Sequence, residues 1–422
     1  MLRFTFKLAI SLSLMFSAGE VLADGSASKQ PFHYQLHNSN LFPWLDGSRS
    51  GLVTDTQGAM AVGLDRLLAE ANDSVDFAVY GIEKQNWLLT RLRKIMRQKS
   101  SVTLRGVVDQ ERGDPGELLK DNFNYPDTVR LIKMLGKDRV LSDVTKYGKV
   151  STAIMHNKLF IIDRESVWLG STNLSYTSVG SEYNANQTLI IKSKDVAQIY
   201  LDQFNQMFDD RLFGFNKIPR ERKRAVNFSD GTSVRIFFSP EDRPRDTAVI
   251  PFIRSAKSTL DIGMFAFTDE RIAKEVVKAH ERGVKVRLIY DAGSGRMVYA
   301  QHRVLTQAGI PVKAENFGGL MHMKTAIVDG KHVLMGSMNW TASGHKDNDE
   351  NTIIVENNKS LAGESTAYFN QLWTAIDQYT VPGVPMLPEG AGSINSCSDG
   401  LDNDYDGKVD ILDTDCANPK PI

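Results

Sequence analysis

Apolar runs alternate with amphipathic stretches along this chain, and the same order occurs twice. The first copy predicts a helix, a strand, a helix and a strand at 60–70, 75–80, 87–97 and 102–109. The second copy predicts the same four elements at 248–255, 260–265, 270–282 and 284–291. Short apolar runs are typical of buried strands, and strand–helix–strand order favours a parallel or mixed sheet covered by helices.

Each copy closes with a further strand and a long helix. These are expected at 188–191 and 195–208 in the first copy, and at 352–355 and 361–379 in the second. A repeat of this length is too long for a solenoid unit and indicates a duplicated domain. We therefore predict an α/β protein with two similar domains, at 24–215 and 216–380, followed by a proline-marked linker at 381–396 and a short acidic tail at 397–416.

The first 23 residues have the pattern of a signal peptide. Arg3 and Lys7 precede an apolar run at 8–16, and Val21 to Ala23 is typical of a cleavage site. The run is too short to span a bilayer, and no later segment is apolar enough to do so. We expect an exported protein, periplasmic or secreted, and a monomer.

Composition adds little about the partner. The 422 residues carry 50 basic and 51 acidic side chains, but seven aspartates lie in the tail at 397–416. The two domains therefore have a slight basic excess, which suits an anionic substrate without identifying it.

The chemistry-bearing pattern also occurs twice, with identical spacing. The first motif has His156, Lys158, Asp163, Gly170, Ser171 and Asn173. The second motif has His322, Lys324, Asp329, Gly336, Ser337 and Asn339. Residues two apart share one face of a strand, so each histidine should point the same way as its lysine. A returning strand should bring Gly-Ser-x-Asn back beside it, with glycine allowing a ligand close to the backbone.

Two such sets suit the cleavage of a phosphodiester. One imidazole attacks phosphorus and forms a phosphohistidine, and the other moves the proton of the leaving alcohol. Two ammonium groups and two amides stabilise the charge that develops on the phosphate oxygens. We therefore expect no cofactor for catalysis.

The doubled motif resembles the signature of the phospholipase D superfamily over residues 50 to 380. The resemblance implies two α/β domains related by a pseudo-twofold axis, with both motifs at their interface. It also implies His156 as nucleophile and His322 as acid and base. It implies phosphate binding by Lys158, Lys324, Asn173 and Asn339, with help from Ser171 and Ser337. Asp163 and Asp329 resemble structural partners of the motifs.

The family also orients each histidine with a downstream carboxylate. Glu350 matches this position in the second half. In the first half Asn186 aligns there instead, and Glu182, four residues earlier, is the alternative that we select. A partner on the second ring nitrogen sets the tautomer of the histidine.

The tail resembles the Asp-rich, cysteine-bracketed calcium repeats of secreted proteins. Its aspartates have the spacing of a calcium loop, with ligands expected from Asp402, Asp404, Asp406, Asp410 and Asp413. The chain has only two cysteines, Cys397 and Cys416, and export favours a disulfide between them over free thiols. The calcium would be structural, and a disordered acidic tail is the alternative.

The motif specifies a phosphodiester but leaves its alcohols open. A phospholipase that releases phospholipid head groups at a membrane surface is the preferred hypothesis, because export places the protein beside envelope lipids. A secreted, metal-independent nuclease is the alternative. A binding module without activity is disfavoured, because both motifs are complete.

Overall fold

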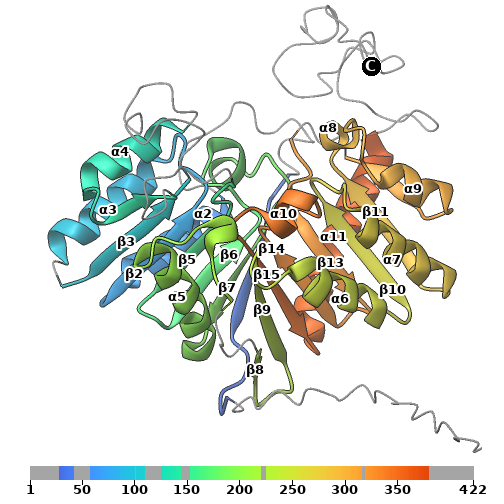
Figure 1. The fold of residues 1–422 in the computed structure, drawn as a ribbon, viewed down its shortest axis with the longest axis horizontal. Helices are drawn as coiled ribbons and strands as arrows, with labels where there is room; N and C mark the ends of the chain where they lie inside the picture. The colour runs from blue at the N-terminus through green and yellow to red at the C-terminus, as the bar shows by residue number, and fades with distance from the viewer. Residues whose placement is uncertain are drawn as a thin grey trace, which may run out of the picture.

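The computed structural model describes residues 28–41, 58–99, 101–109, 125–143, 153–219, 225–315 and 319–379. These residues form two β-sheets flanked by helices, as the sequence predicted for a mixed α/β protein with two similar halves (Figure 1). The predicted signal peptide, linker and Asp-rich tail lie outside the described residues. Within the described part, no helix combines the length and the apolar character that crossing a bilayer requires.

The first sheet is mixed. Its described strands lie in the order β1 (Tyr34–Asn38), β7 (Gln187–Lys192), β6 (Ser166–Gly170), β5 (Lys158–Ile162), β2 (Ser74–Val79), β3 (Thr103–Val108) and β4 (Val140–Ser142). Strands β2, β3 and β4 are parallel, whereas β2, β5, β6, β7 and β1 are joined antiparallel. Its helices are α2 (Ala59–Glu70), α3 (Asn86–Gln98), α4 (Pro126–Leu135) and α5 (Lys194–Phe208), with a π-helical turn η1 (Tyr176–Gly180) and a 3-10 turn η2 (Gly214–Asn216) in loops.

The second sheet repeats this order and adds one strand. Its described strands are β8 (Ala225–Asn227), β9 (Ser233–Ser239), β15 (Glu350–Glu356), β14 (His332–Gly336), β13 (Lys324–Val328), β10 (Thr259–Met264), β11 (Lys285–Tyr290) and β12 (Val312–Ala314). Its helical elements are η3 (Arg245–Val249), α6 (Ile250–Ser255), α7 (Glu270–Glu281), α8 (Ala292–Gly295), α9 (His302–Gln307), α10 (Ala342–Lys346) and α11 (Lys359–Tyr379). The two halves thus correspond strand by strand from β1 and β9 onward.

A central apolar core joins the halves. It contains residues of α5, of α11 and of both sheets, and the rings of Tyr200 and Phe238 meet in it with centroids 5.4 Å apart. Two further cores lie under the outer helices, one for each sheet. Because burial of apolar surface is the main favourable term in folding, the shared core holds the two sheets in one arrangement.

Each motif is carried by a β-hairpin, β5–β6 or β13–β14, as the sequence predicted. The glycine that ends the returning strand has a different purpose from the one expected. A Cβ at Gly170 would lie 2.3 Å from the carbonyl oxygen of Gln187, and one at Gly336 would lie 2.2 Å from that of Asn351. These glycines, with φ of 153° and 150°, therefore admit the neighbouring strand rather than a ligand.

Candidate active site

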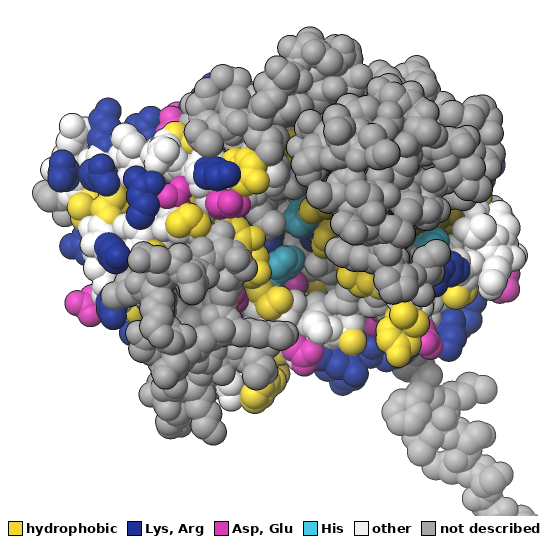
Figure 2. Space-filling model, turned by 90° about the horizontal axis from the view of Figure 1, so that it is seen from above, with side chains coloured by type: hydrophobic (Ala, Val, Ile, Leu, Met, Phe, Trp, Pro, Cys, Tyr) yellow, Lys and Arg dark blue, Asp and Glu magenta, His cyan; other side chains and the backbone are white. Residues whose placement is uncertain are grey.

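The two motifs meet where the sheets adjoin. Short bridges pair Met155 with Asp349 and Ala185 with Met321, so the residue before each motif histidine contacts the other half. Seen from above, histidine side chains lie in a hollow between the halves, with hydrophobic side chains around them (Figure 2). The two motifs therefore form one site.

The first histidine is held by a carboxylate. Nδ1 of His156 lies 2.8 and 2.9 Å from the two carboxylate oxygens of Glu350, which is fully buried. In this arrangement Nδ1–H donates to the carboxylate and Nε2 keeps its lone pair. Burial, and then the charges of Lys158 and Lys324, lower the pKa of His156 well below its ordinary value. Burial also raises the pKa of Glu350 to about 7, against the opposing charge of Lys158. The lowered pKa of His156 favours the neutral imidazole, which is the form with a lone pair on Nε2.

The second histidine is held by an amide. Nδ1 of His322 lies 3.0 Å from Oδ1 of Asn186. The hydroxyl of Ser171 donates to the same oxygen at 2.8 Å, and the Asn186 amide nitrogen donates to the carbonyl of Asn184. These contacts orient the amide so that its oxygen accepts from the Nδ1–H of His322. Burial, followed by the charge of Lys324, lowers the pKa of His322 well below its usual value.

The orienting partners are exchanged between the halves, which corrects the sequence interpretation. Glu350 contacts His156 of the first motif rather than His322 of its own half. Our choice of Glu182 as the partner of His156 was wrong, because its oxygens accept the backbone N–H groups of Asn40 and Met60 near the start of α2. The start of β15 faces the first motif across the junction of the sheets, and spacing along the chain does not reveal such a contact.

The motif lysines lie beside the histidines and are almost fully buried. Nζ of Lys158 donates to the carbonyl of His156 at 2.7 Å, and Nζ of Lys324 donates to that of His322 at 2.8 Å. Burial lowers the pKa of Lys158 to about 7. Burial, and then the charge of Lys158, lower the pKa of Lys324 well below its ordinary value. An anion between the lysines would restore their charge.

The remaining polar side chains of the motifs differ in their surroundings. The side-chain oxygens of Asn173 and Asn339 are buried and have no hydrogen-bond partner within the described structure. An amide can bind a phosphate only through its N–H groups, because its oxygen is an acceptor like the phosphate oxygens. The hydroxyls of Ser171 and Ser337 bond instead to the orienting residues, Ser171 to Asn186 and Ser337 to Glu350.

The motif aspartates lie at the opposite end of the hairpins. Oxygens of Asp163 accept the backbone N–H groups of residues 72–74, and those of Asp329 accept the N–H groups of residues 257–259. Both aspartates have positive φ at the hairpin turn, 53° and 54°. They fix the loops that lead into β2 and β10 and are remote from the histidines.

Two further aspartates position the histidine segments. Asp109 accepts the backbone N–H of Met155 at 2.8 Å, and Asp291 accepts that of Met321 at 3.2 Å. Each therefore holds the residue before a motif histidine. The signal was present in the sequence, because the strands at 102–109 and 284–291 both end in aspartate, but strand ends alone do not reveal what they bind.

A buried cluster of three charged side chains holds the start of β15. Lys217 lies 2.8 Å from Asp349 and 3.0 Å from Glu241, and all three side chains are fully buried. Asp349 is paired with Met155 and precedes Glu350, so this cluster fixes the start of β15 at the site. The equivalent residue in the first half is Ala185, which carries no charge.

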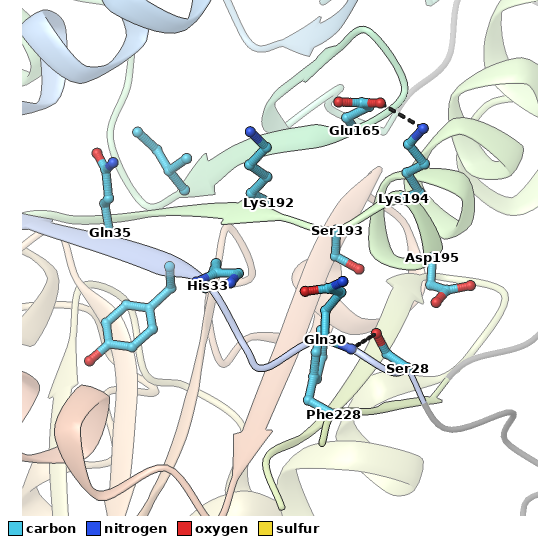
Figure 3. Close-up of a pocket in the computed structure, with 12 residues that line it drawn as sticks. Ser28, Gln30, His33, Gln35, Glu165, Lys192, Ser193, Lys194, Asp195 and Phe228 are labelled. Carbon is cyan, nitrogen blue, oxygen red and sulfur yellow. Dashed lines mark hydrogen bonds and ion pairs between the residues drawn. The ribbon is translucent and has the colours of Figure 1, made fainter. Parts of the chain in front are cut away.

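A separate groove of about 790 Å³ lies at the other end of β7 (Figure 3). Lys192, the last residue of β7, lines the groove. Asn186 of the active site directly precedes the first residue of β7, so the groove and the active site lie at opposite ends of this strand. One of the groove's two lysines, Lys194, is paired with Glu165 at 2.7 Å. The groove is thus distinct from the histidine site.

Within the described residues, no group of three or more histidine, cysteine or acidic side chains is arranged to hold a metal ion. The tail aspartates predicted to bind calcium lie outside those residues.

Known proteins share this architecture. The family model described as "Cardiolipin synthase, PLD-like domain" matches residues 64–208 and 249–373, which is more than half of the chain. The chain belongs to the phospholipase D superfamily. The family expected from the doubled motif is therefore confirmed.

Two curated relatives match a shorter part of the phospholipase D-like chain. The mouse mitochondrial cardiolipin hydrolase is 35% identical over 136 residues, which are 32% of this chain and 61% of that protein. The phospholipase D of Rickettsia prowazekii is 30% identical over 127 residues, 30% of this chain and 62% of that protein. The chain thus spans less than two thirds of the length of either relative.

A solved structure resembles the phospholipase D-like chain over most of its length. The phosphatidylserine synthase of Haemophilus influenzae superposes with a TM-score of 0.56 at 13% identity, covering 81% of this chain and 88% of that protein. At this identity the likeness concerns the fold alone.

Proposed function

We propose that this protein is a phosphodiesterase that cleaves its substrate in two steps, through a phosphohistidine at His156. One observation carries the assignment of roles: His156 is held by the carboxylate of Glu350, whereas His322 is held by the neutral amide of Asn186. The two ring environments differ in charge, and the two steps place different demands on the rings.

In the first step, Nε2 of His156 attacks phosphorus and the bond to the leaving alcohol breaks. The bound anionic diester favours the charged form of His322, which takes up a proton at Nε2 from solvent and donates it to the leaving oxygen. Bonding at Nε2 makes the ring of His156 cationic, and Glu350 stabilises this charge through Nδ1–H. His322 then returns to the neutral form. Its partner, the amide of Asn186, carries no charge that would stabilise the cationic ring and oppose release of the proton.

In the second step, His322 takes a proton from water, and the hydroxyl oxygen bonds to phosphorus. The bond between phosphorus and His156 breaks, and its electron pair returns to the imidazole. Lys158, Lys324 and the two motif amides stabilise the non-bridging oxygens in both steps. The two lysine ammonium groups and the two asparagine amide groups can supply this stabilisation without a metal ion.

We propose a phospholipid as the substrate, with release of the head-group alcohol and formation of phosphatidic acid. The names of the mouse and Rickettsia relatives support a lipid diester, and so do the hydrophobic side chains around the hollow in Figure 2. Export to the envelope is part of the proposal and is supported by the N-terminal sequence.

The deciding assay offers cardiolipin or phosphatidylcholine vesicles and single-stranded DNA to the purified protein in parallel, in EDTA. We expect phosphatidic acid in the lipid reactions. Release of nucleotides without phosphatidic acid would overturn the choice of substrate. Activity that requires an added divalent ion would contradict metal-free catalysis.

The calcium-binding tail is proposed from its aspartate spacing and its two cysteines alone. We expect calcium to raise the melting temperature and to leave kcat unchanged. Calorimetry with and without calcium measures the first effect, and a calcium-dependent kcat would contradict a purely structural role.

A further inference from the structure

Three consecutive apolar side chains are exposed in the loop between α8 and α9. Met297 is 47% exposed, Val298 81% and Tyr299 72%. We call Met297–Tyr299 the apolar tip. Single exposed apolar residues are common on soluble proteins, but adjacent ones mark a surface that contacts another molecule.

Both ends of this loop are anchored beside the active site. Its first end follows α8, which begins after Asp291, and Asp291 also holds Met321 next to His322. At its other end, the N–H of Gln301 donates to the carbonyl of Phe267. The apolar tip therefore stands at the same end of the second sheet as the histidines.

Two more exposed apolar residues lie at the motifs themselves. Ile154 is 38% exposed and Leu320 is 40% exposed, and each is two residues before a motif histidine. They occupy equivalent positions in the two halves. Each half therefore presents an exposed apolar side chain next to its motif histidine.

The apolar tip lies in a basic segment. No acidic residue occurs between Asp291 and Glu315. Arg296 directly precedes the tip, Arg303 follows it by four residues, and both are exposed. A tip with apolar side chains and flanking arginines complements a surface that is apolar inside and anionic outside.

We propose that the apolar tip docks on an anionic phospholipid bilayer and thereby brings a lipid phosphate to His156 and His322. The inference rests on the proposed lipid substrate. Tyr299 suits the interface, because its ring is apolar and its hydroxyl is polar. Met297 and Val298 favour acyl chains over nucleic acid, because aliphatic side chains offer no ring on which a base stacks.

The test is vesicle sedimentation with the wild type, Val298→Asp and a matched control, Phe215→Ser. Phe215 is 67% exposed in η2, which is a different loop from the one that carries the apolar tip. We expect the wild type and Phe215→Ser to bind phosphatidylglycerol vesicles equally, and phosphatidylcholine vesicles more weakly. Val298→Asp should weaken binding to phosphatidylglycerol by about tenfold or more, because a charge replaces an apolar group that docking would bury in the bilayer. Unchanged melting by circular dichroism controls for folding.

Turnover of soluble bis(p-nitrophenyl) phosphate separates docking from catalysis. We expect Val298→Asp to match the wild type on this diester and to lose activity on vesicles. Equal vesicle binding by the wild type and Val298→Asp would overturn the docking proposal, as would a selective loss of single-stranded DNA binding. Failure of the wild type to cleave the soluble diester would contradict the phosphodiesterase proposal instead, while sedimentation still tests docking.

Discussion

The two halves of the molecule have the same strand order and the same motif, but they hold their histidines differently. His156 bonds to a buried carboxylate, and His322 bonds to a buried amide. Their aromatic neighbours differ as well: the ring of Tyr80 packs on His156, and that of Phe265 packs on His322. The residue before each orienting side chain is Asp349 in one half and Ala185 in the other.

This difference teaches that a duplicated motif need not supply duplicated chemistry. A carboxylate stabilises a ring that becomes cationic when it bonds to phosphorus. An amide fixes the tautomer without adding charge, which suits a ring that must both release and accept a proton. Because each orienting residue comes from the other half, neither half can complete its own histidine.

The largest expected effect tests whether both histidines are needed. His156→Asn and His322→Asn should each lower kcat by about 10⁴-fold or more, because each removes one of two obligatory groups. Turnover of a soluble phosphodiester measures this loss. Considerable activity in either variant would contradict a shared site.

The next effect concerns Glu350, whose carboxylate orients His156. Glu350→Gln should lower kcat by about 100-fold, because the cationic phosphohistidine loses its counter-charge while the ring keeps a hydrogen-bond partner. The measurement is steady-state turnover, with thermal melting as the folding control. A loss confined to KM would place Glu350 in substrate binding instead.

A further effect follows from the buried lysines. The pKa of Lys158 is lowered to about 7, and an adjacent anion favours the ammonium form. Above pH 7 the free protein must therefore take up a proton on binding, and affinity should fall by up to about tenfold per pH unit. Below this pKa the lysine already carries its proton, and it no longer makes ligand affinity depend on pH.

This pH dependence can be measured by calorimetry from pH 6 to 9. A methylphosphonate monoester is a suitable ligand, because its single negative charge is constant over the range. Repeating the titration in buffers with different ionisation enthalpies counts the protons. Affinity that rises with pH, or binding without proton uptake at pH 8, would contradict the lowered pKa.

The smallest effect comes from making the halves more alike. Asn186→Asp would place a carboxylate against His322 and raise its pKa. We expect the pH optimum of kcat to move upward by about one unit, with a loss of less than about tenfold at the new optimum. A pH profile measures the shift. An unchanged profile would show that the amide does not set the titration of His322.

Much of this architecture is local and could be predicted from the sequence. The apolar runs at 75–80 and 260–265 became β2 and β10, because a short run of this kind is stable only as a buried strand. The hairpins followed from strand length and turn residues. Strands β1 and β9 were missed, because they pair with β7 and β15, which are distant in the sequence.

The orienting contacts could not be predicted, because they depend on how two sheets pack. Glu350 and His156 are separated by 194 residues, and so are Asn351 and Asn157, whose side chains also bond. Motif spacing identifies the residue types but not the half that each one serves. The apolar tip was missed for a related reason: Met-Val-Tyr in sequence does not show whether it is buried.

The most direct test of the account is to trap the covalent intermediate in His322→Asn. A p-nitrophenyl diester is suitable, because its leaving group departs without a proton, whereas breakdown of the intermediate still requires His322. After rapid denaturation at alkaline pH, which preserves phosphohistidine, peptide mass spectrometry should find the substrate phosphoryl group on His156. No adduct should form in His156→Asn. An adduct on another residue, or no adduct in His322→Asn, would contradict the assignment of His156 as the nucleophile.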